Sequence, residues 1–397
     1  MKISLIQPSR NNLKYLKWSY KAIRKNQGNH EVEICVADDF SDKDNTWKWC
    51  LEMMDKDPHF KAIRNEGPTR LGHTILYDKL VNEVSSHDIC MIYHADMYLC
   101  PGALDHIEQH IGPKKIISLT RIEPPLHPPG PEKILLDCGV EPEEFDENKL
   151  LYHIENKYNI IYKDKTTEGI FAPWAFMKTD FQEINGHDPL YAPQSKEDSD
   201  IFNRFQLNGV TFIQTWEGLV YHMTCRGSRF NPELTTPGKN SSEWEAQNIR
   251  STRNFIRKWG HFCKHDVLMK PIISPKYNIA FIVKNCGGNI LEALEPWCDR
   301  IYIENQDIVD IYINKEQLNT KFDLTKRVFN LSNNTPKLEN DILVEFDATR
   351  LTNENFNLIQ TLPEIIKESG EIGEFELDIL KITINHMEEY QNNLIKI

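Results

Sequence analysis

The N-terminal part of the chain repeats one pattern, in which a short apolar run ends in a polar turn and leads into apolar residues at helical spacing. The apolar runs cover residues 3–6, 32–37, 60–63 and 89–93. Buried strands that alternate with amphipathic helices are typical of a sheet with helices packed on both of its faces. The pattern therefore predicts a β-α-β-α-β-α-β arrangement, which is the doubly wound half of a nucleotide-binding domain.

Polar side chains follow each of these runs. They are Ser9 and Arg10 after the first run, Asp38 and Asp39 after the second, Arg70 after the third, and Asp96 after the fourth. An acidic residue after a strand is most often a turn former or a helix cap. Here the carboxyl ends of the strands would meet at one edge of the sheet, where open α/β sheets bind ligands. The convergence predicts acceptors for a base and ribose, cations for a diphosphate, and a carboxylate for a divalent ion.

Length and charge narrow the class of protein. With 397 residues the chain is too long for one ordinary core, so two domains are expected. The net charge of −13 argues against nucleic acid or an anionic membrane as the main partner.

No apolar run approaches the roughly 20 residues that span a bilayer, and residues 1–8 turn polar too early for a signal peptide, so a cytoplasmic location is expected. Nine cysteines occur singly, which favours reduced core thiols over disulfides or a zinc site.

Three segments in the first half of the chain resemble motifs of the family 2 glycosyltransferases, which have the GT-A fold. In that family the first strand ends in Pro-Thr/Ser-x-Asn, the second ends in Asp-Asp-x-Ser, and an Asp-x-Asp motif precedes a helix that starts with Pro-Gly-x-Leu. The matching segments are Pro8-Ser9-Arg10-Asn11, Asp38-Asp39-Phe40-Ser41, and His94-Ala95-Asp96 followed by Pro101-Gly102-Ala103-Leu104. The resemblance implies a Rossmann-like catalytic domain of the α/β class with a doubly wound mixed sheet.

The resemblance also implies a donor site at this edge of the sheet. Asp39 would contact the nucleotide base, the loop from Pro8 to Arg10 would pack on the nucleoside, and Asp96 would bind a divalent cation that bridges the diphosphate. The residues expected in the donor site are Pro8, Ser9, Arg10, Asp38, Asp39, Arg70, His94, Ala95 and Asp96. His94 stands where the family has the first acid of its motif, so its role in ribose or metal binding stays open.

The middle of the chain resembles the acceptor half of the same family. Residues 168–177 and 181–188 match its acceptor-side segments, and Glu197-Asp198 matches its Glu-Asp motif at a helix start. The resemblance makes Asp198 the general base, with Glu197 beside it. An acceptor hydroxyl has a high pKa and needs a positioned carboxylate to accept its proton as it attacks. Taken alone, residues 195–198 would instead favour a capping box.

Further residues complete the predicted site. His222 matches the histidine that, in many GT-A enzymes, joins the last acid of the Asp-x-Asp motif at the metal. An imidazole and a carboxylate, with phosphate oxygens and water in the remaining positions, suit Mn²⁺ or Mg²⁺. Arg226 and Arg229 are either a lid over the diphosphate or a solvated basic loop. The acceptor side is expected to include Trp174, His187 and Asp188.

The predicted domain boundary lies near residue 265. Residues 1–265 would form the GT-A domain, with its nucleotide half in residues 1–120 and its acceptor half in residues 121–265. Residues 271–397 would form a smaller accessory α/β domain that selects the acceptor or makes homo-oligomer contacts. Its predicted strands are residues 279–283, 301–303 and 342–346. Closing helices are predicted at residues 356–367 and, from the helical spacing of apolar residues, at residues 377–387.

Together these features predict an inverting, metal-dependent glycosyltransferase. It would move a sugar from a nucleotide sugar, with UDP-sugars favoured, to a hydroxyl of a carbohydrate acceptor in glycan or polysaccharide synthesis. A sugar nucleotidyltransferase shares a related nucleotide half, but it would need a glycine-rich loop after the first strand, which residues 8–11 lack. The other alternative is a degenerate GT-A domain that only binds carbohydrate or nucleotide sugar, and His94 is its motivation.

Overall fold

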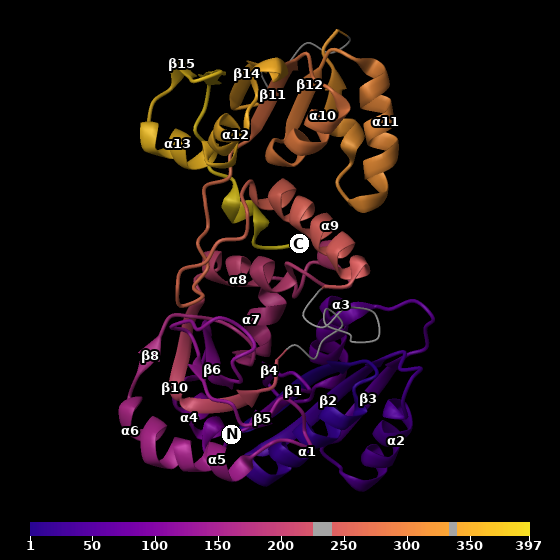
Figure 1. Ribbon diagram of the computed structural model, residues 1–397, viewed down its shortest axis with the longest axis vertical. Coiled ribbons are helices and arrows are strands. Elements are labelled where there is room, and N and C mark those ends of the chain that lie inside the picture. The colour runs from indigo at the N-terminus through magenta and orange to yellow at the C-terminus, as the bar shows by residue number, and fades with distance from the viewer. Residues whose placement is uncertain (225–239, 333–339) are drawn as a thin grey trace. The chain divides into compact units, whose positions relative to one another are not determined.

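The computed structural model describes residues 1–224, 240–332 and 340–397. The chain folds into two compact units, one made of residues 1–245 and 265–271 and the other of residues 246–264 and 272–397 (Figure 1). Helix α9 (Ser242–Trp259), which falls within the predicted first domain of residues 1–265, therefore lies mainly in the C-terminal unit.

The N-terminal unit is built on one mixed sheet with the strand order β3-β2-β1-β4-β9-β6-β10-β5. Its strands are β1 (Lys2–Ser9), β2 (Glu31–Asp39), β3 (Phe60–Asn65), β4 (Ile89–Ile92), β5 (Met97–Leu99), β6 (Lys115–Glu123), β7 (Ile134–Leu135), β8 (Thr166–Thr167), β9 (Trp174–Met177) and β10 (Thr211–His222). The first four strands pair in parallel, whereas β9 is antiparallel to β4 and β6, and β5 is antiparallel to β10. The predicted Rossmann-like fold with a mixed sheet is confirmed.

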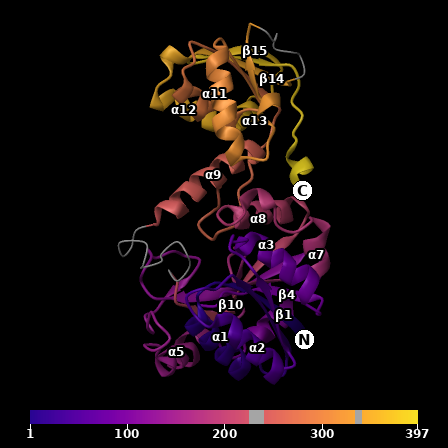
Figure 2. The same cartoon turned by 90° about the vertical axis from the view of Figure 1, so that its right-hand side faces the viewer.

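Helices cover both faces of this sheet. In Figure 2, α1 and α2 lie on one face, and α3, α7 and α8 lie on the other. The helical segments of this unit are α1 (Leu13–Asn26), α2 (Thr46–Lys56), α3 (Gly72–Lys79), η1 (Leu80–Val84), α4 (Ala103–His110), α5 (Glu147–His153), η2 (Ile154–Tyr158), α6 (Asn159–Ile161), α7 (Lys178–Glu183), η3 (Pro189–Tyr191) and α8 (Glu197–Leu207). Because helices lie on both faces, neighbouring side chains such as Leu5 and Ile6 are both fully buried, which explains the continuous apolar runs in the sequence.

The C-terminal unit has its own sheet, with the order β13-β12-β11-β14-β16-β15 and parallel pairing among the first four strands. The N-terminal unit arranges its first four strands in the same order, β3-β2-β1-β4. The strands here are β11 (Ile279–Lys284), β12 (Arg300–Ile303), β13 (Val328–Asn330), β14 (Ile342–Asp347), β15 (Gly373–Leu377) and β16 (Leu380–Ile384). The helical segments are α10 (Gly288–Leu294), η5 (Glu295–Trp297), α11 (Gln306–Glu316), η6 (Gln317–Asn319), η7 (Leu324–Lys326), η8 (Ala348–Arg350), α12 (Asn353–Gln360), α13 (Leu362–Ser369) and η9 (Gln391–Leu394).

The helix predicted at residues 377–387 is wrong, because β15 and β16 form an antiparallel hairpin there. Along β16, the buried side chains of Leu380, Ile382 and Ile384 alternate with the more exposed Lys381 and Thr383. This alternation places one face of the strand on the core. In the sequence, apolar residues three and four positions apart also fit a helix, and only the sheet decides between the two patterns.

A buried ion-pair network ties α9 to the C-terminal unit. Arg257 donates three hydrogen bonds to Glu295, at 2.7, 2.9 and 3.2 Å, and one to Glu316 at 2.5 Å. Arg327 donates to Glu295 as well, at 2.8 Å. A buried charge without its partners is strongly destabilising, so α9 packs where these carboxylates lie.

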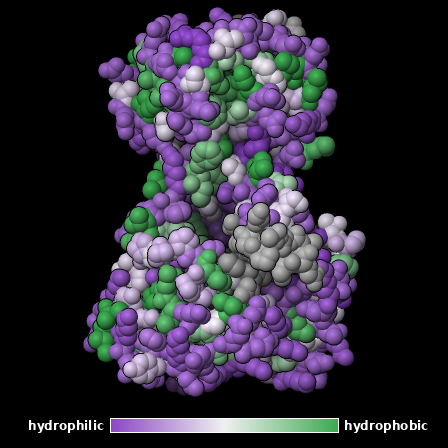
Figure 3. All heavy atoms as spheres, viewed as in Figure 1, coloured by the Kyte–Doolittle hydropathy of each residue, from purple (hydrophilic) through white to green (hydrophobic). Residues whose placement is uncertain are grey.

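The face of the molecule shown in Figure 3 is largely hydrophilic, and apolar side chains lie on it in groups between hydrophilic ones. Exposed large apolar residues, such as Ile249, Val267 and Leu318, are scattered along the chain. In the described part of the chain, no helix has the length and hydropathy needed to cross a membrane.

Candidate active site

The loops after β1 and β2 are fastened to each other at the carboxyl edge of the sheet. Asp38 is fully buried, and its Oδ1 accepts a hydrogen bond from the Ser41 N–H at 3.1 Å. The Ser41 hydroxyl in turn accepts a hydrogen bond from the Asn11 N–H at 2.8 Å. Arg64 on β3 lies 3.4 Å from the other carboxylate oxygen of Asp38, whose pKa is raised by burial. Asp38 therefore stabilises this turn.

Asp39 fastens the loop after β3 to the end of β2. Its Oδ1 accepts hydrogen bonds from the Asn65 side chain at 2.7 Å and from the Leu71 N–H at 3.0 Å, and its Oδ2 accepts one from the Gly72 N–H at 2.9 Å. The Nε of Arg70 lies 3.8 Å from Oδ2. The contact of Asp39 with a nucleotide base stays a prediction, because a base would have to share an oxygen that already accepts from this loop.

Two arginines converge at this edge. The Nε atoms of Arg10 and Arg70 are buried, and no described residue accepts a hydrogen bond from either. Burial lowers the pKa of Arg70, and the positive charge of Arg10 lowers it further. The buried hydroxyl of Ser9 also lacks a partner among residues 1–224, 240–332 and 340–397. Two neighbouring cations with free donors fit an anionic group such as a diphosphate.

His94, Asp96 and His222 form a cluster whose metal-binding atoms all lie within 4.8 Å of one another. Asp96 directly precedes β5, a short strand that the sequence analysis did not predict. β5 pairs with β10 in a register that sets Met97 opposite His222, and the Met223 N–H donates to the Asp96 carbonyl oxygen at 3.0 Å. Strand pairing thus brings together Asp96 and His222, the two residues predicted to hold a metal, and adds His94.

Glu123, the last residue of β6, holds the ring of His222. Its Oε1 lies 2.9 Å from the Nδ1 of His222, and the Nε2 of the same ring lies 3.4 Å from an oxygen of Asp96. Arg121 and Lys133 pair with Glu123 at 2.9 and 3.1 Å. Histidine ligands of metals usually donate their second N–H to a carboxylate in this way, which orients the ring and raises its basicity.

The protonation states of the two histidines suit a divalent cation. Burial lowers the pKa of His94 to about 4, so its ring is neutral and offers a lone pair. Burial also disfavours the charged form of His222, but the carboxylates of Asp96 and Glu123 outweigh it and raise the pKa to about 9. A bound cation would take the place of that proton. Two imidazoles and a carboxylate, with positions left for phosphate oxygens and water, fit Mn²⁺ or Mg²⁺.

Glu197 and Asp198 begin α8 without forming a capping box. The N-cap residue is Lys196, and its side chain makes no capping hydrogen bond. The Nε2 of His73 pairs with Glu197 Oε1 at 2.6 Å, whereas no described residue hydrogen-bonds to the carboxylate of Asp198. Burial and the charge of Glu197 raise the pKa of Asp198 to about 6. The two neighbouring carboxyl groups therefore differ in pKa: Glu197 stays ionised, and Asp198 is the more basic of the two.

Close packing of two loops sets His73 beside Glu197. Gly72 has a φ of +76°, and a Cβ at this position would lie 2.1 Å from the Pro193 carbonyl oxygen. The Thr74 hydroxyl donates to the same carbonyl at 3.2 Å. Any other residue at position 72 would push the start of α3 away from the loop before α8, so this approach requires glycine.

Comparison with protein families covers the part of the site that lies between β1 and β6. Residues 4–123, from β1 to the end of β6, match the sequence profile described as glycosyl transferase family 2. This segment belongs to glycosyl transferase family 2. The glycosyltransferase segment contains Asp38, Asp39 and Asp96, and it ends on Glu123.

Solved structures resemble the chain remotely. The mannosyltransferase PcManGT from Pyrobaculum calidifontis, in complex with GDP-Man and Mn²⁺, is 14% identical with a TM-score of 0.40, over 62% of this chain and 61% of that chain. GalNAc-T7 with UDP, GalNAc and Mn²⁺ is 12% identical with a TM-score of 0.45, over 65% and 48%. TarS from S. aureus is 14% identical with a TM-score of 0.41, over 64% and 44%. The chain thus spans less than two thirds of each of them, and a comparison with curated protein sequences finds no match.

Tyr77 on α3 is buried near the carboxylates of Asp198, Glu197 and Asp96. Its pKa is raised well above the usual value by burial and by the charges of Asp198, Glu197 and Asp96. The Tyr77 ring stacks on His187, with ring centroids 5.4 Å apart. The predicted acceptor-side residue His187 is therefore at this site, and its buried Nε2 lacks a hydrogen-bond partner within the described ranges.

Other residues predicted for this site are buried or half-buried, or cap a turn, in the structure. Trp174 on β9 is fully buried against three phenylalanines, so an acceptor could contact it only if neighbouring side chains moved. Asp188 caps the turn η3, where its side chain accepts a hydrogen bond from a backbone N–H at 2.9 Å. Pro8 is half-buried at the end of β1, and Ala95 is buried between His94 and Asp96.

Three residues of the site were not predicted from the sequence: His73, Tyr77 and Glu123. His73 and Tyr77 lie in a segment whose apolar spacing indicated only an amphipathic helix. Glu123 is an acidic residue at the end of a strand, as Asp39 is. Looking for polar residues at strand ends would have found Glu123 if β6 had been predicted. Arg226 and Arg229, the predicted lid over the diphosphate, lie outside the described residues.

Proposed function

We propose that the N-terminal unit transfers a sugar from a nucleotide-sugar donor to an acceptor hydroxyl with inversion at the anomeric carbon. The observation that carries the proposal is the carboxylate of Asp198. It begins α8 in the same unit as the segment that matches glycosyl transferase family 2, it has no hydrogen-bond partner in the described part of the chain, and its pKa is raised to about 6. A carboxylate with these properties is suited to accept a proton near neutral pH.

In this proposal each group of the site has one task. Asp198 accepts the proton of the acceptor hydroxyl while the hydroxyl oxygen forms a bond to the anomeric carbon. The bond from that carbon to the diphosphate breaks at the same time, so the configuration inverts. Arg10 and Arg70 bind the diphosphate, and His73 lowers the pKa of Glu197 and so keeps it ionised beside the base.

His94, Asp96 and His222 would hold Mn²⁺ or Mg²⁺ in this site. The ion would supply Lewis-acid stabilisation of the negative charge on the leaving diphosphate. Glu123 orients His222, and Arg121 and Lys133 keep Glu123 in place. UDP-sugars are the first donors to test, and a carbohydrate hydroxyl is the acceptor.

A screen of nucleotide sugars with Mn²⁺ tests the proposal. A donor that binds the folded protein should stabilise it by about 2.7 kcal/mol at a hundredfold excess over its dissociation constant, which a thermal-shift measurement detects. Hydrolysis of the same donor should depend on Mn²⁺ or Mg²⁺. Binding without hydrolysis or transfer would favour the binding-only alternative, and the absence of binding by every donor would contradict the proposal.

The transfer rate should fall about tenfold for each pH unit below about pH 6, because the base acts only in its ionised form. Glu197→Gln removes a negative charge that raises the pKa of Asp198, so this acid limb should move to lower pH. Rates measured across this range at saturating donor for both proteins test the prediction. An acid limb that stays in place or moves to higher pH in Glu197→Gln would contradict it.

Glu123→Gln should weaken the binding of Mn²⁺ by roughly tenfold to a hundredfold, because the amide no longer raises the basicity of His222. Titration calorimetry with Mn²⁺ alone measures this without any turnover. Glu183→Gln is the control, since it removes one carboxylate from an exposed pair with Lys114 in the same unit. Equal Mn²⁺ affinity in the two variants would exclude the proposed task of Glu123.

A further inference from the structure

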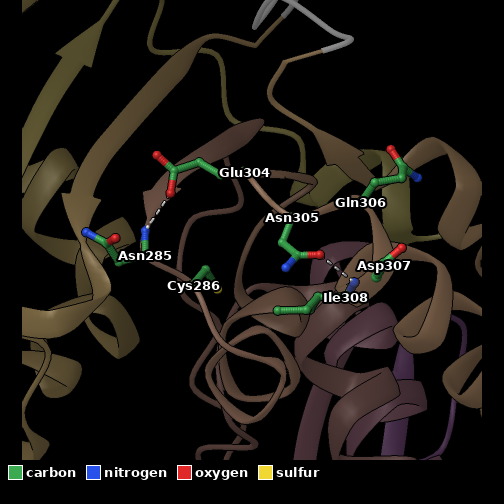
Figure 4. Close-up of a pocket in the computed structure, with 7 residues that line it drawn as sticks. All are labelled: Asn285, Cys286, Glu304, Asn305, Gln306, Asp307 and Ile308. Carbon is green, nitrogen blue, oxygen red and sulfur yellow. Dashed lines mark hydrogen bonds between the residues drawn. The ribbon is translucent and has the colours of Figure 1, made fainter.

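A hollow of about 550 Å³ lies in the C-terminal unit at the carboxyl ends of β11 and β12. It is lined by Asn285 and Cys286 after β11 and by residues 304–308, which follow β12 and begin α11 (Figure 4). The four parallel strands of this sheet have the same order as those that carry the donor site of the N-terminal unit. In open parallel sheets, ligands bind outside the carboxyl ends of the strands.

The walls of this hollow are joined by hydrogen bonds. The Asn285 N–H donates to Glu304 at 2.9 Å, which ties the loop after β11 to the end of β12 (Figure 4). The Asn285 side chain donates to Asp347 at 2.9 Å, which ties the same loop to the end of β14. These hydrogen bonds hold the hollow in shape without a ligand, and ligand pockets are usually pre-formed in this way.

The lining differs in charge from the donor site of the N-terminal unit. Its polar side chains are the carboxamides Asn285, Asn305 and Gln306 and the carboxylates Glu304 and Asp307, and no lysine or arginine is among the lining residues that the structure describes. The donor site presents two arginines at the corresponding edge of its sheet. A nucleoside diphosphate in this hollow would bring its negative charges next to those of Glu304 and Asp307, which disfavours it.

We propose that this hollow binds a neutral saccharide. Asn285 and Gln306 already donate to Asp347 and Asp310, and Asn305 already accepts from the Ile308 N–H. The other polar atom of each carboxamide, together with the carboxylates, which accept hydrogen bonds strongly, matches the hydroxyl groups of a sugar. Ile308 offers an apolar contact for the face of the ring.

Isoleucine-methyl NMR of the full-length protein tests the proposal. Ile308 is a local reporter, and its δ1-methyl resonance is assigned as the one lost in Ile308→Leu. The probes are free glucose, galactose, mannose, N-acetylglucosamine and N-acetylgalactosamine. At least one of them should shift the Ile308 resonance in a saturable way, and the shift should persist in Asp198→Asn. Binding at this hollow therefore succeeds or fails independently of transfer by the N-terminal unit.

A pair of matched variants sharpens the test. Asp307 and Glu354 are both exposed acids and are the second residues of α11 and α12. Asp307→Asn should weaken sugar binding roughly tenfold, the loss expected for one hydrogen bond to a charged group, while Glu354→Gln should leave it unchanged. Equal affinities in the two variants would overturn the proposal.

Other probes decide between ligand classes. If UDP or Mg²⁺ alone shifts the Ile308 resonance and none of the sugars does, the hollow is a nucleotide or cation site and the saccharide proposal is wrong. The proposal is also wrong if no probe shifts this resonance, or if the shift is lost in Asp198→Asn, which would assign it to the N-terminal unit.

Discussion

Asp198→Asn should lower the rate of sugar transfer by about 10²- to 10⁴-fold, the usual contribution of a positioned general base. Asparagine has nearly the same shape, but its amide cannot accept the proton of the acceptor hydroxyl. The carboxylate makes no hydrogen bond to any residue that the structure describes, so its replacement breaks none of these contacts. Donor binding, followed by thermal shift, should therefore persist while transfer is lost.

Asp164→Asn is the control for this experiment. Asp164 is an exposed residue of the same unit with a φ of +57°, a conformation that asparagine adopts readily. The control should transfer sugar at the unaltered rate. If Asp198→Asn retains a rate within a few-fold of the control, Asp198 is not the base and the proposed mechanism fails.

Asp96→Asn should abolish metal-supported transfer and weaken Mn²⁺ binding by more than about a hundredfold. The replacement removes the negatively charged group of the three that would hold the ion. Loss of a residue that only orients a metal ligand costs roughly tenfold to a hundredfold in affinity or activity, so loss of a ligand should cost more. Calorimetry with Mn²⁺ alone and transfer at saturating donor measure the two effects separately.

His94→Asp is the informative comparison, because it replaces an imidazole nitrogen by an oxygen that also binds Mn²⁺. We expect this variant to keep metal-dependent transfer. Unchanged Mn²⁺ affinity in Asp96→Asn would show that the ion binds elsewhere or not at all. Loss of Mn²⁺ binding in His94→Asp with a folded protein would show that the site requires the histidine.

Local patterns in the sequence were sufficient for the strands that carry the donor edge. β1, β2 and β4 coincide in sequence with the apolar runs. Strands that are buried on both faces need nearly every side chain to be apolar, so such runs identify them. The polar residues at their ends meet at one edge, as parallel pairing requires. The hairpin of β15 and β16 shows the limit, since a few apolar residues fit two periods and the neighbouring strand β14 decides between them.

Residues that act through partners far along the chain could not be identified from the sequence. His73 and Glu197 are 124 positions apart, and Glu123 and His222 are 99 positions apart. In neither pair does the position of one residue in the sequence indicate which residue it contacts. Their contacts depend on the order of the strands and on a glycine at position 72 that lets two loops touch.

The sequence by itself determined the α/β class, the edge at which Asp39 and Asp96 lie, and the carboxylate proposed as the base, because each follows from a local period or a short motif. Only the tertiary structure decided that His94 stands with Asp96 and His222, that Glu123 orients the ring of His222, and that Asp198 remains without a hydrogen-bond partner among the described residues. The physical reason is that the charge and proton affinity of a buried group are set by the groups around it. Pairing of β5 with β10 brings those groups together, and the sequence does not record that pairing.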